Sequence, residues 1–120
     1  MTKVLVVEDS SLNMELALDI LNAQGFTACG AENAKEAIRM VEKEIYDLIL
    51  MDIELPDMDG VAVTKIIKSK PEYKDTPVIA LTAYAMKGDR ERFLGEGFDD
   101  YISKPIDVDD FMRRMEKYRK

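Results

Sequence analysis

The stretch DLILMDIELPDMDG, residues 47–60, raises the question that decides the fold. Residues 48–51 form a short apolar run of the kind that fills a buried strand. The run leads directly into the carboxylate of Asp52, and further acidic residues follow: Glu54, Asp57 and Asp59. A buried strand that ends in this much negative charge predicts a polar site at the end of the strand.

The composition is that of an acidic, globular chain of one-domain size. It has 120 residues, 47% of them hydrophobic, and a net charge of −7. A chain of this length can bury enough surface for one core, so we expect a single domain over residues 1–120 without an output domain. The negative charge argues against nonspecific binding, and we expect neither nucleic acid nor a membrane as a partner.

Missing features narrow the chemistry further. No apolar run approaches the ~20 residues of a membrane span, and the N-terminus enters a strand at once instead of forming a signal peptide. A single cysteine, Cys29, permits no internal disulfide and fits a cytoplasmic protein. The chain has no histidine, so any step that needs a histidine must take it from a partner.

Two hydrophobic periodicities alternate along the chain. Short apolar runs predict five strands, at residues 3–7, 27–31, 47–51, 78–81 and 101–103. Segments with helical spacing follow each strand, and Asn33 and Asp107 are typical N-cap residues for two of these helices. Five such units with short links predict an α/β fold, a doubly wound five-stranded parallel sheet in the order 2-1-3-4-5 with five helices.

Polar residues stand where four of the predicted strands end: Glu8, Asp9, Asp52, Thr82 and Lys104. The carboxyl ends of parallel strands lie at one edge of a sheet, and ligands bind there at the topological switch point. Two bare charges about 4 Å apart repel by roughly 4 kcal/mol at an effective dielectric of 20, so three carboxylates require a cation or shared protons. Oxygen ligands favour hard ions, and the pattern predicts Mg²⁺.

A nucleophilic carboxylate, a hydroxyl, a lysine and Mg²⁺ are the parts that phosphoryl transfer to an aspartate requires. The segments VLVVEDS, DLILMDIELPDMDG, VIALTA and YISKP carry these residues. By the order and spacing of these segments, the whole chain resembles the receiver domain of two-component response regulators. This resemblance implies a flavodoxin-like fold. ALTAYAMKGDRE and YISKPI are similar to stand-alone receivers of the DivK type, and receivers of hybrid histidine kinases carry similar strings.

The resemblance implies a phosphoacceptor and a metal site. Asp52 corresponds to the phosphoacceptor and also to a ligand of Mg²⁺. Asp9 and the backbone carbonyl of Glu54 correspond to further direct ligands. Glu8, which stands where a second aspartate is commoner, is expected to reach the metal through water.

The resemblance also implies how the phosphoryl group is held and sensed. The hydroxyl of Thr82 is expected to hydrogen-bond a phosphoryl oxygen, and Lys104 is expected to pair with the group and to precede a cis bond to Pro105. Tyr101 corresponds to the switch aromatic that turns inward when Thr82 moves toward the phosphate. Tyr84 is expected to obstruct the water that hydrolyses the phosphorylated form.

These roles imply a signalling protein that catalyses only its own phosphorylation and dephosphorylation. The phosphodonor would be a phosphohistidine of a histidine kinase or histidine phosphotransfer protein, and the effect would come from binding a downstream protein partner. Three other functions stay open: a receiver excised from a hybrid histidine kinase, an aspartyl-phosphate phosphohydrolase and a flavodoxin-like electron carrier. A phosphohydrolase of the haloacid-dehalogenase type has a second aspartate where this chain has Glu54, and no phosphate loop of the flavodoxin kind follows the first strand.

The first helix has apolar residues on two sides. At 100° per residue, Leu16, Ala17 and Ile20 share the face expected to lie on the sheet. A second stripe is turned away from it: Met14, Leu18 and Leu21. A surface helix needs only one apolar stripe, so the second predicts a docking surface for a helix of the phosphodonor. The other interpretation is that Leu21 belongs to the core and the remaining two are scattered surface residues.

Overall fold

The five predicted strands form one parallel sheet. The computed structural model describes residues 2–83 and 89–119, without the side chains of residues 89 and 90. The strand order β2-β1-β3-β4-β5 confirms the predicted topology. The strands are β1 (Lys3–Val7), β2 (Thr27–Ala31), β3 (Leu48–Asp52), β4 (Val78–Thr82) and β5 (Asp100–Ser103).

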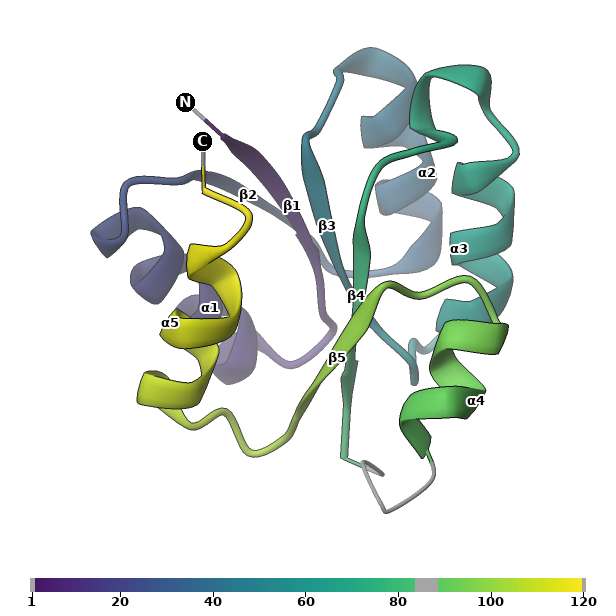
Figure 1. Ribbon diagram of the computed structural model, residues 1–120. Helices are drawn as coiled ribbons and strands as arrows, with labels where there is room; N and C mark the ends of the chain where they lie inside the picture. The colour runs from purple at the N-terminus through teal and green to yellow at the C-terminus, as the bar shows by residue number, and fades with distance from the viewer. Residues whose placement is uncertain (1, 84–88, 120) are drawn as a thin grey trace.

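Helices cover both faces of the sheet, as the alternating periodicities predict. Their bounds are α1 (Ser11–Ala23), α2 (Ala34–Lys43), α3 (Gly60–Lys68), α4 (Asp89–Gly95) and α5 (Val108–Glu116). Figure 1 shows α1 and α5 on one face and α2, α3 and α4 on the other. A short 3₁₀ helix, η1 (Pro71–Tyr73), was not predicted from the sequence. No helix in the described part of the chain is long and apolar enough to cross a membrane.

Local side chains fix the helix ends. The side chain of Asn33 accepts a hydrogen bond from the N–H of Glu36 at the start of α2, and that of Asp107 accepts one from the N–H of Asp110 at the start of α5. These caps satisfy backbone donors that have no partner within the helix. Both predicted N-caps are therefore confirmed.

The core consists of two apolar clusters separated by the sheet. One contains inward residues of α2, α3 and α4, and the other contains residues of α1 and α5. β3 is buried along its whole length because it lies between β1 and β4 and is covered on both faces. A strand held in this way is a rigid support for the side chain at its carboxyl end.

The second apolar stripe of α1 is partly buried. Leu21 is 0% exposed and packs in the cluster that α1 shares with α5. The prediction that it contacts a partner is therefore wrong, and the other interpretation, that Leu21 belongs to the core, is confirmed. Met14 and Leu18 are half-buried against the same cluster, and the sulfur of Met14 lies close to Gly30 of β2. Leu21 is buried because α1 packs against both the sheet and α5, which gives the helix a wider apolar contact than one face.

Candidate functional site

Three carboxylates meet where β1 and β3 end. Asp52 is the last residue of β3, and Glu8 and Asp9 follow β1, its neighbour in the sheet. One carboxylate oxygen from each residue lies within 4.8 Å of the others. Glu8 and Asp52 are buried, whereas Asp9 is exposed. The structure thus brings together the three acidic residues that the sequence places at the switch point.

Asp52 is held by one donor on each carboxylate oxygen. Its Oδ1 accepts a hydrogen bond of 2.9 Å from the N–H of Glu54, and its Oδ2 lies 3.1 Å from Nζ of Lys104. The residue as a whole is only 3% exposed. Burial, together with the neighbouring Glu8 carboxylate, raises the pKa of Asp52 to about 7, although the Glu54 N–H and Lys104 act in the opposite direction.

Lys104 bridges the two buried carboxylates. Its Nζ lies 2.7 Å from Oε1 of Glu8 and 3.1 Å from Oδ2 of Asp52. Burial acts to lower the pKa of Lys104, but contact with Glu8 and Asp52 outweighs burial and raises it, so the ammonium stays charged. The backbone N–H of Lys104 donates to the backbone carbonyl of Thr82 at 2.8 Å, and the peptide bond from Lys104 to Pro105 is cis.

Thr82 and Tyr101 lie on the adjacent strands β4 and β5. Thr82 ends β4 and is buried, in register with Ser103. Tyr101 is half-buried, and its ring packs on Phe93 of α4 with the ring centroids 5.8 Å apart. Tyr84, the residue expected to obstruct water, lies outside the described residues.

Gly60 supports the site in a way that the sequence analysis missed. A Cβ atom at this position would lie 2.2 Å from the carbonyl oxygen of Asp52 and 2.8 Å from Cα of Ile53. The N–H of Gly60 donates to the carbonyl of Ile53 at 2.8 Å. The start of α3 therefore packs directly on the backbone that carries Asp52, and a glycine is required for this approach.

The two later aspartates of the segment are structural. Asp59 is the N-cap of α3 and accepts from the N–H of Val61 at 2.7 Å. Asp57 accepts from the N–H groups of Ala34 and Lys35 at 2.9 and 3.1 Å, so it caps α2 across the loop. These contacts lower the pKa of Asp57 and tie the loop after β3 to α2.

The donor set fits a small, hard divalent cation. Three carboxylates converge at the carboxyl ends of β1 and β3, and Lys104 neutralises only part of their negative charge. Hard ions such as Mg²⁺ take oxygen ligands and keep several waters, which suits a site with one exposed carboxylate, Asp9. Glu54 follows Asp52 closely, and its carbonyl as a ligand stays a prediction.

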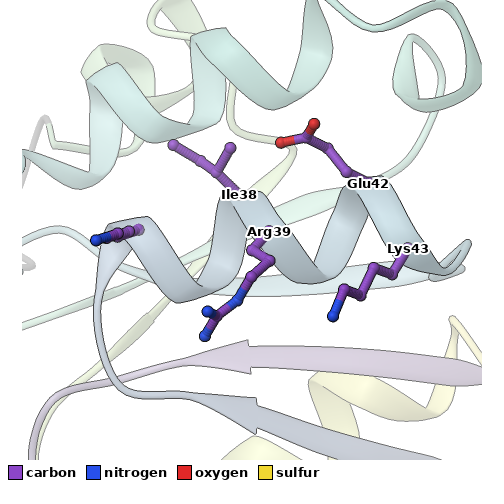
Figure 2. A pocket seen from close by; sticks show the side chains of 5 residues that line it. Ile38, Arg39, Glu42 and Lys43 are labelled. Atoms are coloured by element: carbon purple, nitrogen blue, oxygen red, sulfur yellow. The ribbon is translucent and has the colours of Figure 1, made fainter.

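A surface hollow of about 410 Å³ lies elsewhere, on α2. Figure 2 shows Arg39 and Lys43 pointing to one side of the helix and Ile38 and Glu42 to the other. This hollow is lined by none of the residues of the acidic cluster. The candidate site is therefore identified by its converging charges and not by the size of a cavity.

Comparisons with known proteins identify the family of the chain. Residues 4–116 match the model of the response regulator receiver domain. The polar-differentiation response regulator DivK of Brucella anthropi is 45% identical over 115 residues, which are 96% of this chain and 94% of that protein. DivK of Brucella ovis is 45% identical over 119 residues, covering 98% of this chain and 97% of that protein.

Solved structures share the fold. The chemotaxis response regulator CheY4 of Vibrio cholerae superimposes with a TM-score of 0.92 over 99% of each chain at 24% identity, which supports the fold alone. The receiver domain of the sensor histidine kinase PA1611 of Pseudomonas aeruginosa has a magnesium ion coordinated in its active-site cleft. It is 34% identical with a TM-score of 0.86, over 98% of this chain and 96% of that one. The chain belongs to the family of response regulator receiver domains.

Proposed function

We propose that the chain is a signalling receiver that accepts a phosphoryl group on Asp52 from a phosphohistidine of a histidine kinase or histidine phosphotransfer protein. The observation that carries this proposal is the position of Asp52, buried at the end of the central strand and in contact with both Lys104 and the acidic cluster. No histidine occurs in these 120 residues, so the donor histidine must lie outside them.

In the transfer step, a carboxylate oxygen of Asp52 attacks the phosphorus. A P–O bond forms, the P–N bond to the imidazole breaks, and the electron pair of that bond leaves with the donor histidine, which takes up a proton. Asp52 must be ionised to react, and a pKa of about 7 in the metal-free protein leaves part of the population protonated. Lys104 favours the ionised form and offsets charge on the transferred group.

Asp9, Asp52, the Glu54 carbonyl and, through water, Glu8 would hold Mg²⁺ at this site. The bound ion would supply positive charge against the carboxylates and the phosphoryl oxygens. Support comes from the three carboxylate oxygens within 4.8 Å of one another and from the magnesium of the 34% identical PA1611 receiver domain.

The phosphorylated state would be read by Thr82 and Tyr101. The Thr82 hydroxyl would bond a phosphoryl oxygen, and Tyr101 would move inward as Thr82 shifts. The signal would then pass to a downstream protein partner, with no substrate turned over other than the phosphoryl group of Asp52 itself. We place this activity in the cytoplasm, because a single cysteine without a disulfide fits that compartment.

The phosphodonor would dock beside the acidic cluster on the first turns of α1. Leu12 is 75% exposed there, and a hollow of about 210 Å³ is lined by Leu12, Glu15, Leu16 and Asp19. This surface adjoins Asp9 along the chain. In this proposal the surface around Leu12 replaces the stripe through Leu21 as the contact for a donor helix. Met14 and Leu18 are half-buried, and the accessible parts of their side chains would add to that contact.

Labelling by a small donor tests the proposal. The protein is incubated with acetyl phosphate, with and without Mg²⁺, and its intact mass is measured. One phosphoryl group should be added in the presence of Mg²⁺ and none to Asp52→Asn. Asp57→Asn, a matched change on the same loop, should be labelled like the wild type, and equal labelling of Asp52→Asn would contradict the assignment.

Two arrangements of the receiver differ in where the donor lies. A stand-alone receiver is favoured by the match to DivK over nearly the full length of both proteins. A receiver within a hybrid kinase is favoured by the 34% identity to the PA1611 domain. The molecular mass of the protein in extracts of its source cells decides between them: a band of about 14 kDa supports the first, and a much larger one supports the second.

A further inference from the structure

The ring of Tyr101 contacts two helices at once. Phe93 of α4, which is buried, lies 5.8 Å away between ring centroids. From α5, the guanidinium carbon of Arg114 lies 5.5 Å from the Tyr101 ring centroid. A guanidinium at this distance from an aromatic face makes a favourable cation–π contact. Any movement of the Tyr101 ring must therefore change its contact with α5.

Arg114 is held over the ring by three hydrogen bonds. Its Nε donates to Oδ2 of Asp110 at 3.0 Å. Its Nη1 donates to the carbonyl oxygen of Tyr101 at 3.1 Å and to Oδ1 of Asp100 at 3.3 Å. The same Oδ1 of Asp100 accepts the N–H of Tyr101 at 2.8 Å. The ring and both backbone polar groups of Tyr101 thus belong to one network centred on Arg114.

The acidic members of this network are themselves fixed. Asp100 is only 7% exposed, and its Oδ2 lies 3.3 Å from Nζ of Lys117. Burial acts to raise the pKa of Asp110, but hydrogen bonds from Arg113 and Arg114 outweigh burial and lower it. Asp110 therefore remains a charged partner of Arg114, and the planar guanidinium is well placed to bridge the Asp110 and Asp100 side chains.

We propose that Arg114 is a positioning residue that sets the resting position of Tyr101 and thereby couples phosphorylation of Asp52 to the surface of α5. This proposal rests on the proposed function, since it requires Tyr101 to respond to the state of Asp52. The contact with Arg114 stabilises the position of Tyr101 seen in the structure. A ligand at Asp52 that draws the ring toward Thr82 must work against that contact.

The coupling is reciprocal. A change that removes the cation from the ring favours the inward position of Tyr101, and it must then also tighten binding of any ligand that prefers that position. A cation–π contact at a partly exposed site corresponds to a shift of about threefold in such an equilibrium. If Arg114 only connected α5 to β5, its removal would lower the stability of the protein but would not change the population of the inward position of Tyr101.

The test follows the Tyr101 ring directly. The protein is labelled with 3-fluorotyrosine, and the fluorine resonance of Tyr101 is assigned with Tyr101→Phe. It is recorded with Mg²⁺ alone and during titration with beryllofluoride, a small mimic of the phosphoryl group. The variants are Arg114→Gln, which removes the cation, and Asp110→Asn, which removes the acceptor of its Nε. Arg113→Gln is the matched control, because Arg113 also pairs with Asp110 but is exposed.

In Arg114→Gln, the resonance without beryllofluoride should move toward its beryllofluoride position, and the half-saturating beryllofluoride concentration should fall about threefold. Asp110→Asn should move the resonance in the same direction by a smaller amount. If Arg114→Gln does not fold, Asp110→Asn provides the test of the proposal. Arg113→Gln should behave like the wild type. An unmoved resonance in both test variants, or an equal shift in Arg113→Gln, would overturn the role of Arg114.

The same experiment separates this proposal from the function on which it rests. A wild-type protein that is labelled on Asp52 by acetyl phosphate, but whose Tyr101 resonance ignores beryllofluoride, would overturn the role of Arg114 and leave Asp52 as the acceptor. A wild-type protein that takes neither acetyl phosphate label nor beryllofluoride would overturn the proposed function itself.

Discussion

Gly60 approaches Asp52 so closely that a Cβ atom on Gly60 would lie 2.2 Å from the backbone carbonyl oxygen of Asp52. The contact joins the first residue of α3 to the last residue of β3. The neighbour is backbone, which cannot rotate away as a flexible side chain could. The placement of the nucleophile therefore depends on the absence of a single methyl group.

Gly60→Ala should destabilise the protein and disturb Asp52 together. The added methyl must push α3 away from β3, and overpacking of this kind costs about 1–3 kcal/mol. We expect the urea midpoint to fall and labelling by acetyl phosphate to slow at a temperature where the variant is still folded. Gly95→Ala is the control, because a Cβ atom there meets nothing within 4 Å. A Gly60→Ala protein as stable and as readily labelled as Gly95→Ala would contradict the close approach.

The raised pKa of Asp52 makes the metal-free protein less stable as the pH rises. Because the folded-state value of about 7 lies above the ordinary value of 3.8, the folded state binds the proton more tightly. The resulting stabilisation is present below the unfolded pKa and is lost as the pH rises through about 7. In EDTA, Asp52→Asn should therefore unfold about 5 °C above the wild type at pH 8, and the difference should disappear near pH 4.

Mg²⁺ should bind more tightly over the pH range in which the metal-free protein becomes less stable, because both effects come from ionisation of Asp52. Binding requires ionised carboxylates, so the apparent affinity should increase as the pH rises through about 7, with release of a proton from the Asp52 region. Calorimetric titration in two buffers of different ionisation enthalpy measures that release. A pH-independent affinity between pH 6 and 8 would show that Asp52 is already ionised in the metal-free protein.

The exposed start of α1 should govern transfer from a protein donor but not from a small one. Leu12→Asp introduces a charge into the apolar contact proposed for the donor helix and should slow phosphotransfer about tenfold or more, which is the effect of losing ~1.4 kcal/mol at an interface. Labelling by acetyl phosphate should be unchanged.

Ile45→Asp is the matched control for Leu12→Asp, because Ile45 is also a large exposed apolar side chain but lies between α2 and β3, at the amino ends of the strands. Both variants are compared in rapid-quench transfer from a phosphorylated histidine protein. Equal transfer rates for the two would place the docking surface away from α1.

The strands and the acidic cluster could be predicted because they depend on local patterns. Alternating periodicities gave the element order, and the carboxyl ends of parallel strands must share an edge, which brings Asp9 and Asp52 together. Predicted strand bounds differed by a residue or less at each end: β4 includes Thr82 because the ladder to Ser103 continues there, and β5 begins at Asp100.

The features that sequence analysis missed all depend on how the elements pack. Leu21 lay outside the predicted buried face, and the sequence could not decide between a core and a partner contact for it. It is buried because α1 also packs on α5, where the Gln24 side chain donates to the carbonyl of Met112 at 2.9 Å. Gly60 and Arg114 act on residues of other elements, and nothing in their immediate neighbours along the chain signals those contacts. Asp57 caps α2, an element that lies more than twenty residues away from it along the chain.

Mapping the phosphorylated residue tests the central claim most directly. Protein labelled by acetyl phosphate and Mg²⁺ is reduced with borohydride, which converts a phosphoaspartate to homoserine, and its peptides are sequenced by tandem mass spectrometry. The account predicts homoserine at position 52 alone. Homoserine at Asp9, Asp57 or Asp59 with an unmodified Asp52 would contradict it.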